Sequence, residues 1–160
     1  MTACTENRAA GLTTASVAPV VLDELMAAIG NERLMIATVM PDHVHALFEV
    51  GERLTLSQVI GRTKSLAGSC LATSESKWQR GFFDRRLRPE DSLESFALYV
   101  FLNPYRAGLI GLFERWPWTR VGTRVRFRFL DALESGAPVP HEWLGEIERW
   151  ERTIGDGIGD

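Results

Sequence analysis

Residues 33–50 carry the apolar and polar pattern of a β-hairpin. Residues 34–40 are a mostly apolar, β-prone run, and Pro41-Asp42 is a turn signal. In the segment that follows, every second residue from Val44 to Val50 is apolar, and His43 and His45 fall between these positions. Because side chains alternate between the faces of a strand, the second strand should bury one face and carry both histidines on the other.

Three further stretches have the period of amphipathic helices. The first, residues 17–29, has Pro19 in its first turn and Gly30-Asn31 at its end. The second, residues 55–73, begins at a cap formed by Thr55 or Ser57. Its apolar positions are Leu56, Val59, Ile60, Leu66 and Leu71. The third, residues 90–102, has an apolar stripe at Leu93, Phe96, Ala97 and Val100.

The remaining segments are shorter or less regular. Residues 78–87 have the pattern of a strand, and residues 120–128 are a basic, alternating stretch that predicts an extra strand or an exposed arm. After a proline-rich stop, residues 141–154 have helical period and should pack back on the domain through Trp143, Leu144, Ile147 and Trp150. The tail from residue 155 is expected to be disordered.

Length and composition are those of one soluble globular domain. The chain has 160 residues, 45% of them hydrophobic, without a long uninterrupted apolar run, so we expect no membrane contact. Residues 1–8 lack the basic-then-apolar form of a signal peptide, which favours the cytoplasm. Cys4 and Cys70 are far apart, a spacing that fits neither a zinc knuckle nor a disulfide framework.

Four residues with candidate chemistry fall on the predicted hairpin and the third helix. His43 and His45 are two apart on a strand, so both imidazoles can reach one metal ion. Tyr99 and Asn103 are four apart and share one side of the helix, off the centre of its apolar stripe. Pro104 should end this helix near Asn103, which makes a C-terminal cap the alternative role of that residue. A metal held between strand and helix would lie beside the phenol of Tyr99.

Three motifs in a fixed order resemble those of a known family. They are residues 40–45 (MPDHVH), residues 78–85 (WQRGFFDR) and residues 99–109 (YVFLNPYRAGL). Together they resemble the REP-associated tyrosine transposases, part of the wider group of HUH single-tyrosine transposases that act on single-stranded DNA. The resemblance runs from about residue 17 to about residue 118.

The resemblance implies an α+β fold of the ferredoxin-like kind. Its antiparallel sheet would have four or five strands, with two main helices on one face. Residues 1–120 would form the catalytic domain, and residues 121–160 a C-terminal extension that packs on it. Residues 1–8 resemble only the end of the family's first strand, so we expect a short first strand in the sheet that carries the histidines.

The resemblance also implies roles for the candidate residues. His43 and His45 would be paired metal ligands, Asn103 a polar third ligand, and Tyr99 the nucleophile; Tyr105 is the weaker candidate for that nucleophile. Two imidazoles and an amide oxygen suit Mg²⁺ or Mn²⁺. The implied reaction nicks and rejoins single-stranded DNA, next to a hairpin, through a phosphotyrosine link. The enzyme could act as a monomer or as a homodimer.

Charge is distributed unevenly along the chain, whose net charge of -3 is unusual for a protein that binds DNA. Residues 53–128 carry 14 basic and 6 acidic side chains, whereas residues 1–52 carry 2 and 7, and residues 129–160 carry 2 and 8. The basic middle block favours contact with DNA phosphates. Its candidate DNA-binding residues are Arg62, Lys64, Trp78, Arg80, Arg85 and Arg86. For each one singly, an ordinary solvated side chain is the alternative.

Two other functions are compatible with the same residues. The chain could be a domesticated module that binds DNA hairpins without cutting them, an interpretation favoured by the acidic ends and the short first strand. It could also be an unrelated zinc enzyme, in which His141 joins His43 and His45 around the ion.

Overall fold

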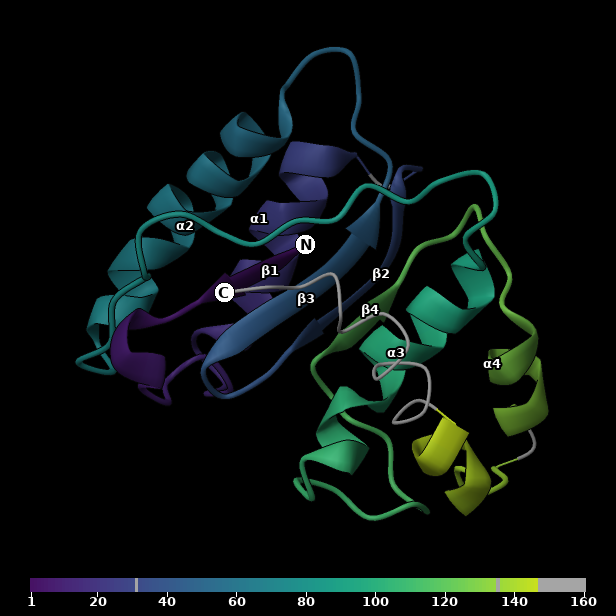
Figure 1. Ribbon diagram of the computed structural model, residues 1–160. Helices are drawn as coiled ribbons and strands as arrows, with labels where there is room; N and C mark the ends of the chain where they lie inside the picture. Colours follow the sequence, from purple (N-terminus) through teal and green to yellow (C-terminus); the bar gives the residue numbers. More distant parts are fainter. Residues whose placement is uncertain (31, 135, 147–160) are drawn as a thin grey trace.

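A four-stranded antiparallel sheet forms the centre of the structure, with helices on both faces (Figure 1). The computed structural model describes residues 1–30, 32–134 and 136–146. The strands lie in the order β1-β3-β2-β4. Their bounds are β1 Thr2–Cys4, β2 Leu34–Val39, β3 His43–Phe48 and β4 Thr119–Val121.

Two helices cover one face of the sheet, as expected for a ferredoxin-like α+β fold, and a third covers the other (Figure 1). Helices α1 (Ala18–Ile29) and α2 (Leu56–Ala72) pack on each other and on the sheet. Helix α3 (Leu93–Arg106) packs on the opposite face, together with α4 (Arg128–Leu133). A short 3-10 turn, η1 (Glu6–Arg8), follows β1. Among the described residues, no helix has the length and apolar character needed to cross a membrane.

Helices α1 and α2 begin and end where local chemistry predicts. Pro19 lies in the first turn of α1, and Gly30 ends it with a φ of 90°, a conformation that glycine adopts without strain. Thr55 caps α2 in a reciprocal capping box with Gln58. One expected apolar position was wrong: Leu66 is 45% exposed, and its neighbour Ala67 is buried instead.

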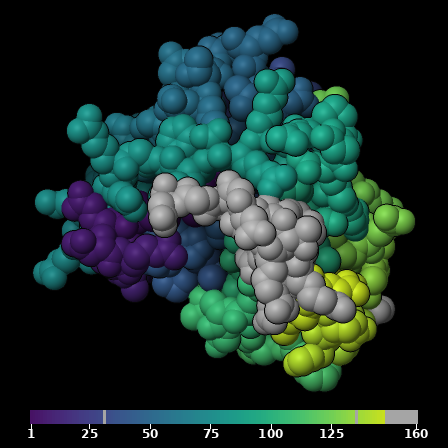
Figure 2. Space-filling model, viewed as in Figure 1, coloured from purple at the N-terminus to yellow at the C-terminus, as the bar shows by residue number. Residues whose placement is uncertain are grey.

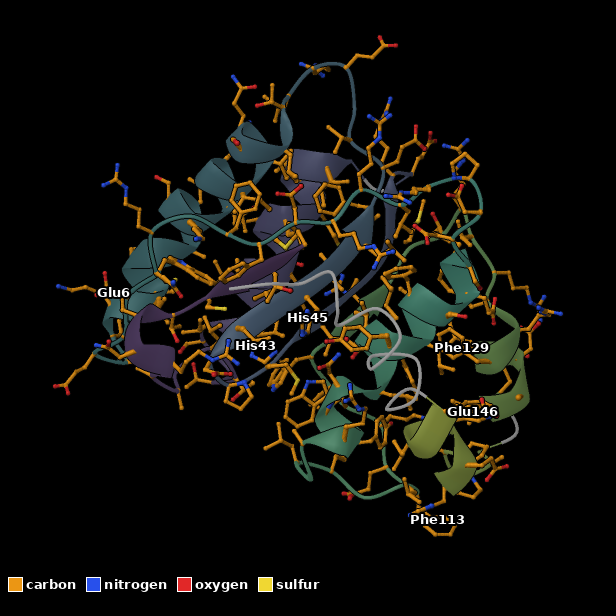
Figure 3. All side chains as sticks on the ribbon, viewed as in Figure 1. Glu6, His43, His45, Phe113, Phe129 and Glu146 are labelled. Atoms are coloured by element: carbon orange, nitrogen blue, oxygen red, sulfur yellow. The ribbon has the colours of Figure 1, made fainter. Side chains whose placement is uncertain are left out.

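The hairpin of β2 and β3 confirms the predicted alternation. Val44 and Ala46 are buried in the core beneath α1 and α2. His43 and His45 point to the other face, toward α3 (Figure 3). The pairing of β3 with its neighbours fixes which face each side chain occupies. A shift of β3 by one residue would bury the histidines in the apolar core.

A row of polar residues crosses the whole sheet at the level of His45. In β1 its partner is Thr2, and in β2 its partner is Thr38, which in turn pairs with Thr119 of β4. The hydroxyls of Thr38 and Thr119 are hydrogen-bonded at 2.9 Å. The three-residue β1 therefore lies beside the strand that carries the histidines, as predicted from the short match of residues 1–8.

The strand predicted at residues 78–87 is wrong as a regular element. Only two isolated bridges form, between Thr5 and Trp78 and between Thr2 and Phe83. The segment does lie along the free edge of β1, where a ferredoxin-like sheet has its next strand. A regular ladder is interrupted because Gly81 has a φ of 79°, which turns the backbone out of the extended conformation.

Helix α3 is longer than predicted, because Pro104 lies inside it rather than beyond its end. Pro104 has no N–H to donate to the carbonyl one turn back. Its ring and the Tyr105 side chain are nevertheless buried, so packing outweighs the local preference. Asn103 is therefore a helical residue and not a C-terminal cap; the helix ends at Arg106, and Ala107 is its C-cap.

The segment after α3 completes the second core. Residues 119–121 form β4 at the edge of β2, so the stretch of residues 120–128, predicted as an extra strand or an arm, is a strand only at residues 120 and 121. Phe127 and Phe129 then pack against α3. Residues 141–146 are helical, and Trp143 and Leu144 pack on this core as expected. The rest of that predicted helix and the tail lie outside the described residues.

Candidate active site

The two histidines of β3 converge on one point. Their Nε2 atoms are 3.0 Å apart, and their rings meet edge to face with centroids 4.6 Å apart. Each residue is only 9% exposed, and Figure 3 shows them next to each other on β3. Two ring nitrogens directed at one point are the arrangement of a paired metal ligand.

The outer nitrogen of each imidazole has its own partner. Nδ1 of His43 lies 2.6 Å from Oδ1 of Asp42, and Nδ1 of His45 lies 2.9 Å from Oγ1 of Thr2. A carboxylate only accepts hydrogen bonds, so Nδ1 of His43 donates and its Nε2 carries the lone pair. The proton between the two Nε2 atoms then belongs to His45, whose Nδ1 accepts from the Thr2 hydroxyl.

Burial keeps both rings neutral. It lowers the pKa of His43 below its ordinary value of 6.5, although the hydrogen bond and charge of Asp42 act in the opposite direction. For His45, burial lowers the pKa well below 6.5, and the neighbouring His43 lowers it further. Neutral imidazole is the form that binds a metal, and Nε2 of His43 carries the free lone pair that a ligand needs.

Tyr99 lies against this histidine pair. Its ring meets that of His45 edge to face, with centroids 5.5 Å apart, and the Arg106 guanidinium lies 5.5 Å from the tyrosine ring centroid. Tyr105, on the same helix, is 5% exposed, and its hydroxyl donates to the carbonyl oxygen of Glu114 at 2.9 Å. Of the two tyrosines, only Tyr99 is therefore in contact with a histidine of the candidate site.

Asn103 lies one turn after Tyr99, and its Nδ2 donates to the Tyr99 carbonyl oxygen at 2.8 Å. This bond uses the amide nitrogen, so the oxygen is the atom suited to a cation. Among the described residues, no cluster of three His, Cys, Asp or Glu side chains could hold a metal. The alternative zinc site with His141 is therefore wrong: that residue is exposed, at the start of the last helical segment.

The basic candidates divide into two groups. Arg62, Arg80 and Arg86 are exposed and can reach a ligand. Arg85 is also exposed; it pairs with Asp91 at 3.4 Å and lies 5.2 Å from the Phe96 ring centroid.

Lys64 and Trp78 are more enclosed than the sequence suggested. The Lys64 ammonium donates to the carbonyl oxygens of Gln79 and Gly81 and lies 5.7 Å from the Trp78 ring centroid, and burial lowers its pKa. Trp78 packs against the core of α1 and α2. The contacts of both residues hold the segment after α2 in place, so stacking of DNA on Trp78 would need that segment to move.

Comparison with protein families identifies the wider group. A family model described as Transposase IS200 like matches residues 2–97, more than half of the chain. The chain belongs to the IS200-like transposase family.

Two relatives resemble this IS200-like transposase. A protein of Haemophilus influenzae named as a putative REP-associated tyrosine transposase is 22% identical over an alignment of 95 residues that covers 51% of this chain and 54% of the relative. The chain thus matches about half the length of that protein. The solved structure of a REP-associated tyrosine transposase bound to a REP hairpin superposes with a TM-score of 0.60 at 16% identity, covering 79% of this chain and 86% of the other. At that identity, the likeness shows the fold.

Sequence reasoning missed three residues that support the histidines of the candidate site. Asp42 was taken only as part of a turn, although it precedes His43 directly and bonds its ring. Thr2 and Arg8 come close only because β1 pairs with β3 and η1 folds back on the hairpin. Contacts between residues so far apart in the sequence leave no local pattern that could predict them. The position of Asp42 directly before a candidate ligand, by contrast, was a signal that could have been used.

Proposed function

We propose that the chain nicks and rejoins single-stranded DNA with Tyr99 as nucleophile. The observation that carries this proposal is the contact of the Tyr99 ring with His45, whose Nε2 lies 3.0 Å from that of His43. A phenol beside paired, neutral imidazoles combines a nucleophile with a site for a divalent cation.

The residues present fit such a cation. His43 and His45 would supply two nitrogen ligands and Asn103 its amide oxygen, a mixed set that suits Mg²⁺ or Mn²⁺. Bound there, a divalent ion would polarise the scissile phosphate and offset the charge that develops on it.

The protein's own groups account for the rest of the reaction. The Tyr99 hydroxyl loses its proton, and its oxygen forms a bond to phosphorus while the bond from phosphorus to the 3′ oxygen breaks. The 3′ oxygen gains a proton in turn and leaves as a hydroxyl. The phosphate stays on Tyr99, linked to the 5′ side of the cut. Because one phosphodiester replaces another, the reverse attack by a 3′ hydroxyl rejoins a strand without ATP. The Arg106 guanidinium, close to the tyrosine ring, would attract the phosphate.

The substrate we propose is single-stranded DNA flanking a hairpin. The related solved structure holds a REP hairpin, and this chain has exposed arginines in its basic middle block. Arg62, Arg80, Arg85 and Arg86 would neutralise phosphates, which gives a salt-dependent affinity.

A covalent-adduct assay tests the nucleophile. Labelled single-stranded oligonucleotides with a hairpin are incubated with protein and Mg²⁺ or Mn²⁺, then resolved on a denaturing gel. We expect an adduct with the unmodified protein and with Tyr105→Phe, and none with Tyr99→Phe. An adduct with Tyr99→Phe would show that the nucleophile is wrongly assigned.

A second candidate function is hairpin binding without cleavage. It is favoured by the three-residue β1, whose Thr2 is the hydrogen-bond partner of His45. In that case the same oligonucleotides would bind with a salt-dependent affinity, and no adduct would form with any divalent metal.

A further inference from the structure

An ion pair next to the site connects the N-terminal turn to one of the histidines. Nε of Arg8 lies 2.7 Å from Oδ2 of Asp42, and the other carboxylate oxygen of Asp42 accepts from Nδ1 of His43 at 2.6 Å. Asp42 thus holds the guanidinium with one oxygen and the imidazole with the other. With both oxygens engaged, its carboxylate plane, and hence the direction of the His43 ring, is fixed.

The turn that supplies Arg8 has an unfavourable backbone. Asn7 and Arg8 have φ values of 53° and 55°, in the left-handed region that residues other than glycine seldom adopt. Thr5, fully buried before the turn, donates through its N–H to the Asp42 carbonyl oxygen at 2.9 Å. Its hydroxyl hydrogen is shared between the carbonyl oxygens of Ala9 at 2.7 Å and Asp42 at 3.0 Å. The turn therefore holds Asp42 through the backbone of Thr5 and the side chain of Arg8. Such contacts can keep a strained backbone in place near a functional site.

We propose that η1, acting through Arg8 and Asp42, is a positioning device that orients His43 as a metal ligand. The proposal rests on the metal-binding role given to His43 above. It assigns a function to residues that neither contact the phosphate nor ligate the ion.

The two histidines differ in how firmly they are held. Asp42 can only accept, so it locks His43 with the proton on Nδ1 and the lone pair on Nε2. Thr2 can donate or accept, so the His45 ring can carry its proton on either nitrogen. To serve as a ligand through Nε2, the His45 ring would carry its proton on Nδ1, and the Thr2 hydroxyl would then accept a hydrogen bond from that nitrogen. His43 is pre-set for the ion, whereas His45 adapts to it.

Mn²⁺ affinity of the full chain, without DNA, tests the device. Asp42→Ala should weaken binding by about 10- to 100-fold, the usual effect of removing a carboxylate behind a histidine ligand. Asp42→Asn should recover part of the loss, because its amide oxygen still accepts from Nδ1. The N-terminal segment that contains Arg8 lies at the surface (Figure 2). Because the Arg8 side chain is 56% exposed, Arg8→Ala should weaken binding less, up to about fivefold, and Arg8→Lys should recover part of the loss.

The matched control is Arg126→Ala. Arg126 makes the same Nε-to-carboxylate contact at 2.7 Å, with Asp131, and that aspartate contacts no histidine. Its loss should leave Mn²⁺ affinity unchanged. Circular dichroism and urea unfolding of each variant establish that it is folded before its affinity is compared.

Imidazole nitrogen NMR shifts of the metal-free protein provide a reading that does not depend on metal binding. We expect the His43 proton on Nδ1 in the unmodified protein and a mixture of both tautomers in Asp42→Ala. Unchanged tautomers and unchanged Mn²⁺ affinity in Asp42→Ala would overturn the proposal. If the unmodified protein binds no Mn²⁺ at all, the metal-dependent function fails, and the tautomers still decide whether Asp42 orients the ring.

Discussion

The two faces of the central sheet come from the same strands but differ in the side chains that they carry. On the α1 and α2 face, Val44 and Ala46 are each 2% exposed in a hydrophobic core. On the α3 face, the alternating residues His43 and His45 are each 9% exposed and bonded to polar partners. One face stabilises the fold by burial of apolar surface, and the other also carries the polar residues of the candidate site.

This difference shows how the fold fixes the site. Because side chains alternate, burial of Val44 and Ala46 dictates the direction of both imidazoles. The histidines need no apolar contacts of their own to stay in register. We therefore expect substitutions on the first face to change stability and substitutions on the second to change chemistry, and the predictions below test that separation.

The largest effect on stability is expected on the first face, from Leu71→Ala. Leu71 of α2 is fully buried, so the truncation should lower the free energy of unfolding by about 3 kcal/mol. Adduct formation per folded molecule should not change. Urea unfolding measures the first quantity and the gel assay the second.

Leu66→Ala on the same helix is the matched control. The same atoms are removed at a position 45% exposed, so the loss should stay within about 0.5 kcal/mol. A drop in adduct yield with Leu71→Ala, after correction for the folded fraction, would show that the two faces are not separate.

A pH-dependent loss of stability is the signature expected of the second face. The pKa of His45 is well below 6.5 in the folded protein, whereas an unfolded chain takes up a proton near 6.5. Between these values the unfolded state binds more protons, so stability falls as pH is lowered from 7. The slope is up to about 1.4 kcal/mol per pH unit for one neutral buried imidazole.

The measurement is urea unfolding at pH 7.0 and 5.5 in the presence of a chelator. His45→Gln removes the buried imidazole, so its stability should depend less steeply on pH than that of the unmodified protein. His43, whose pKa is also lowered by burial, should act in the same direction and leave part of the slope. Equal slopes in both proteins would mean that His45 is not buried as a neutral ring.

How far the sequence predicts this structure depends on whether the determinants are local. The alternation of residues 43–48 and the capping signal at Thr55 lie within a few residues, and both predictions are confirmed. Val50, expected on the buried face, lies beyond the end of β3 and is 46% exposed. Pro104 was misjudged because burial of its ring outweighs its helix-ending preference. Residues 78–87 were misjudged because strand formation depends on the partner, and β1 is only three residues long.

The candidate site divides in the same way. His43 and His45 could be found from their spacing, and Tyr99 from the helical flank it occupies, because both periodicities are local. That Tyr99 packs on His45 required α3 to lie across β3, which spacing does not specify. The support from Arg8 and Thr2 was beyond reach for the same reason.

A smaller effect on stability is expected from Tyr105→Phe, within the second face. Its hydroxyl donates to the Glu114 carbonyl oxygen, which also accepts from Arg115 at 3.1 Å. The carbonyl therefore keeps a partner, and the loss should be about 1 kcal/mol. Urea unfolding checks this value. A loss of adduct in this variant would mean that Tyr105, which packs in the core of the second face, also contributes to adduct formation.

The smallest effects on stability are expected from substitutions at the helix caps. These substitutions destabilise the helices of the two faces one at a time. Thr55 accepts from the Gln58 N–H at 3.3 Å, and Ser92 accepts from the Ser95 N–H at 3.2 Å. Alanine at either position should cost about 1 kcal/mol or less, because only one end of one helix frays. Hydrogen exchange should speed up in the first turn of α2 for Thr55→Ala and of α3 for Ser92→Ala. Faster exchange in α3 as well for Thr55→Ala would mean that a change on one face of the sheet reaches the other face. The positions of the histidines would then depend on the stability of α2, and not only on the register of β3.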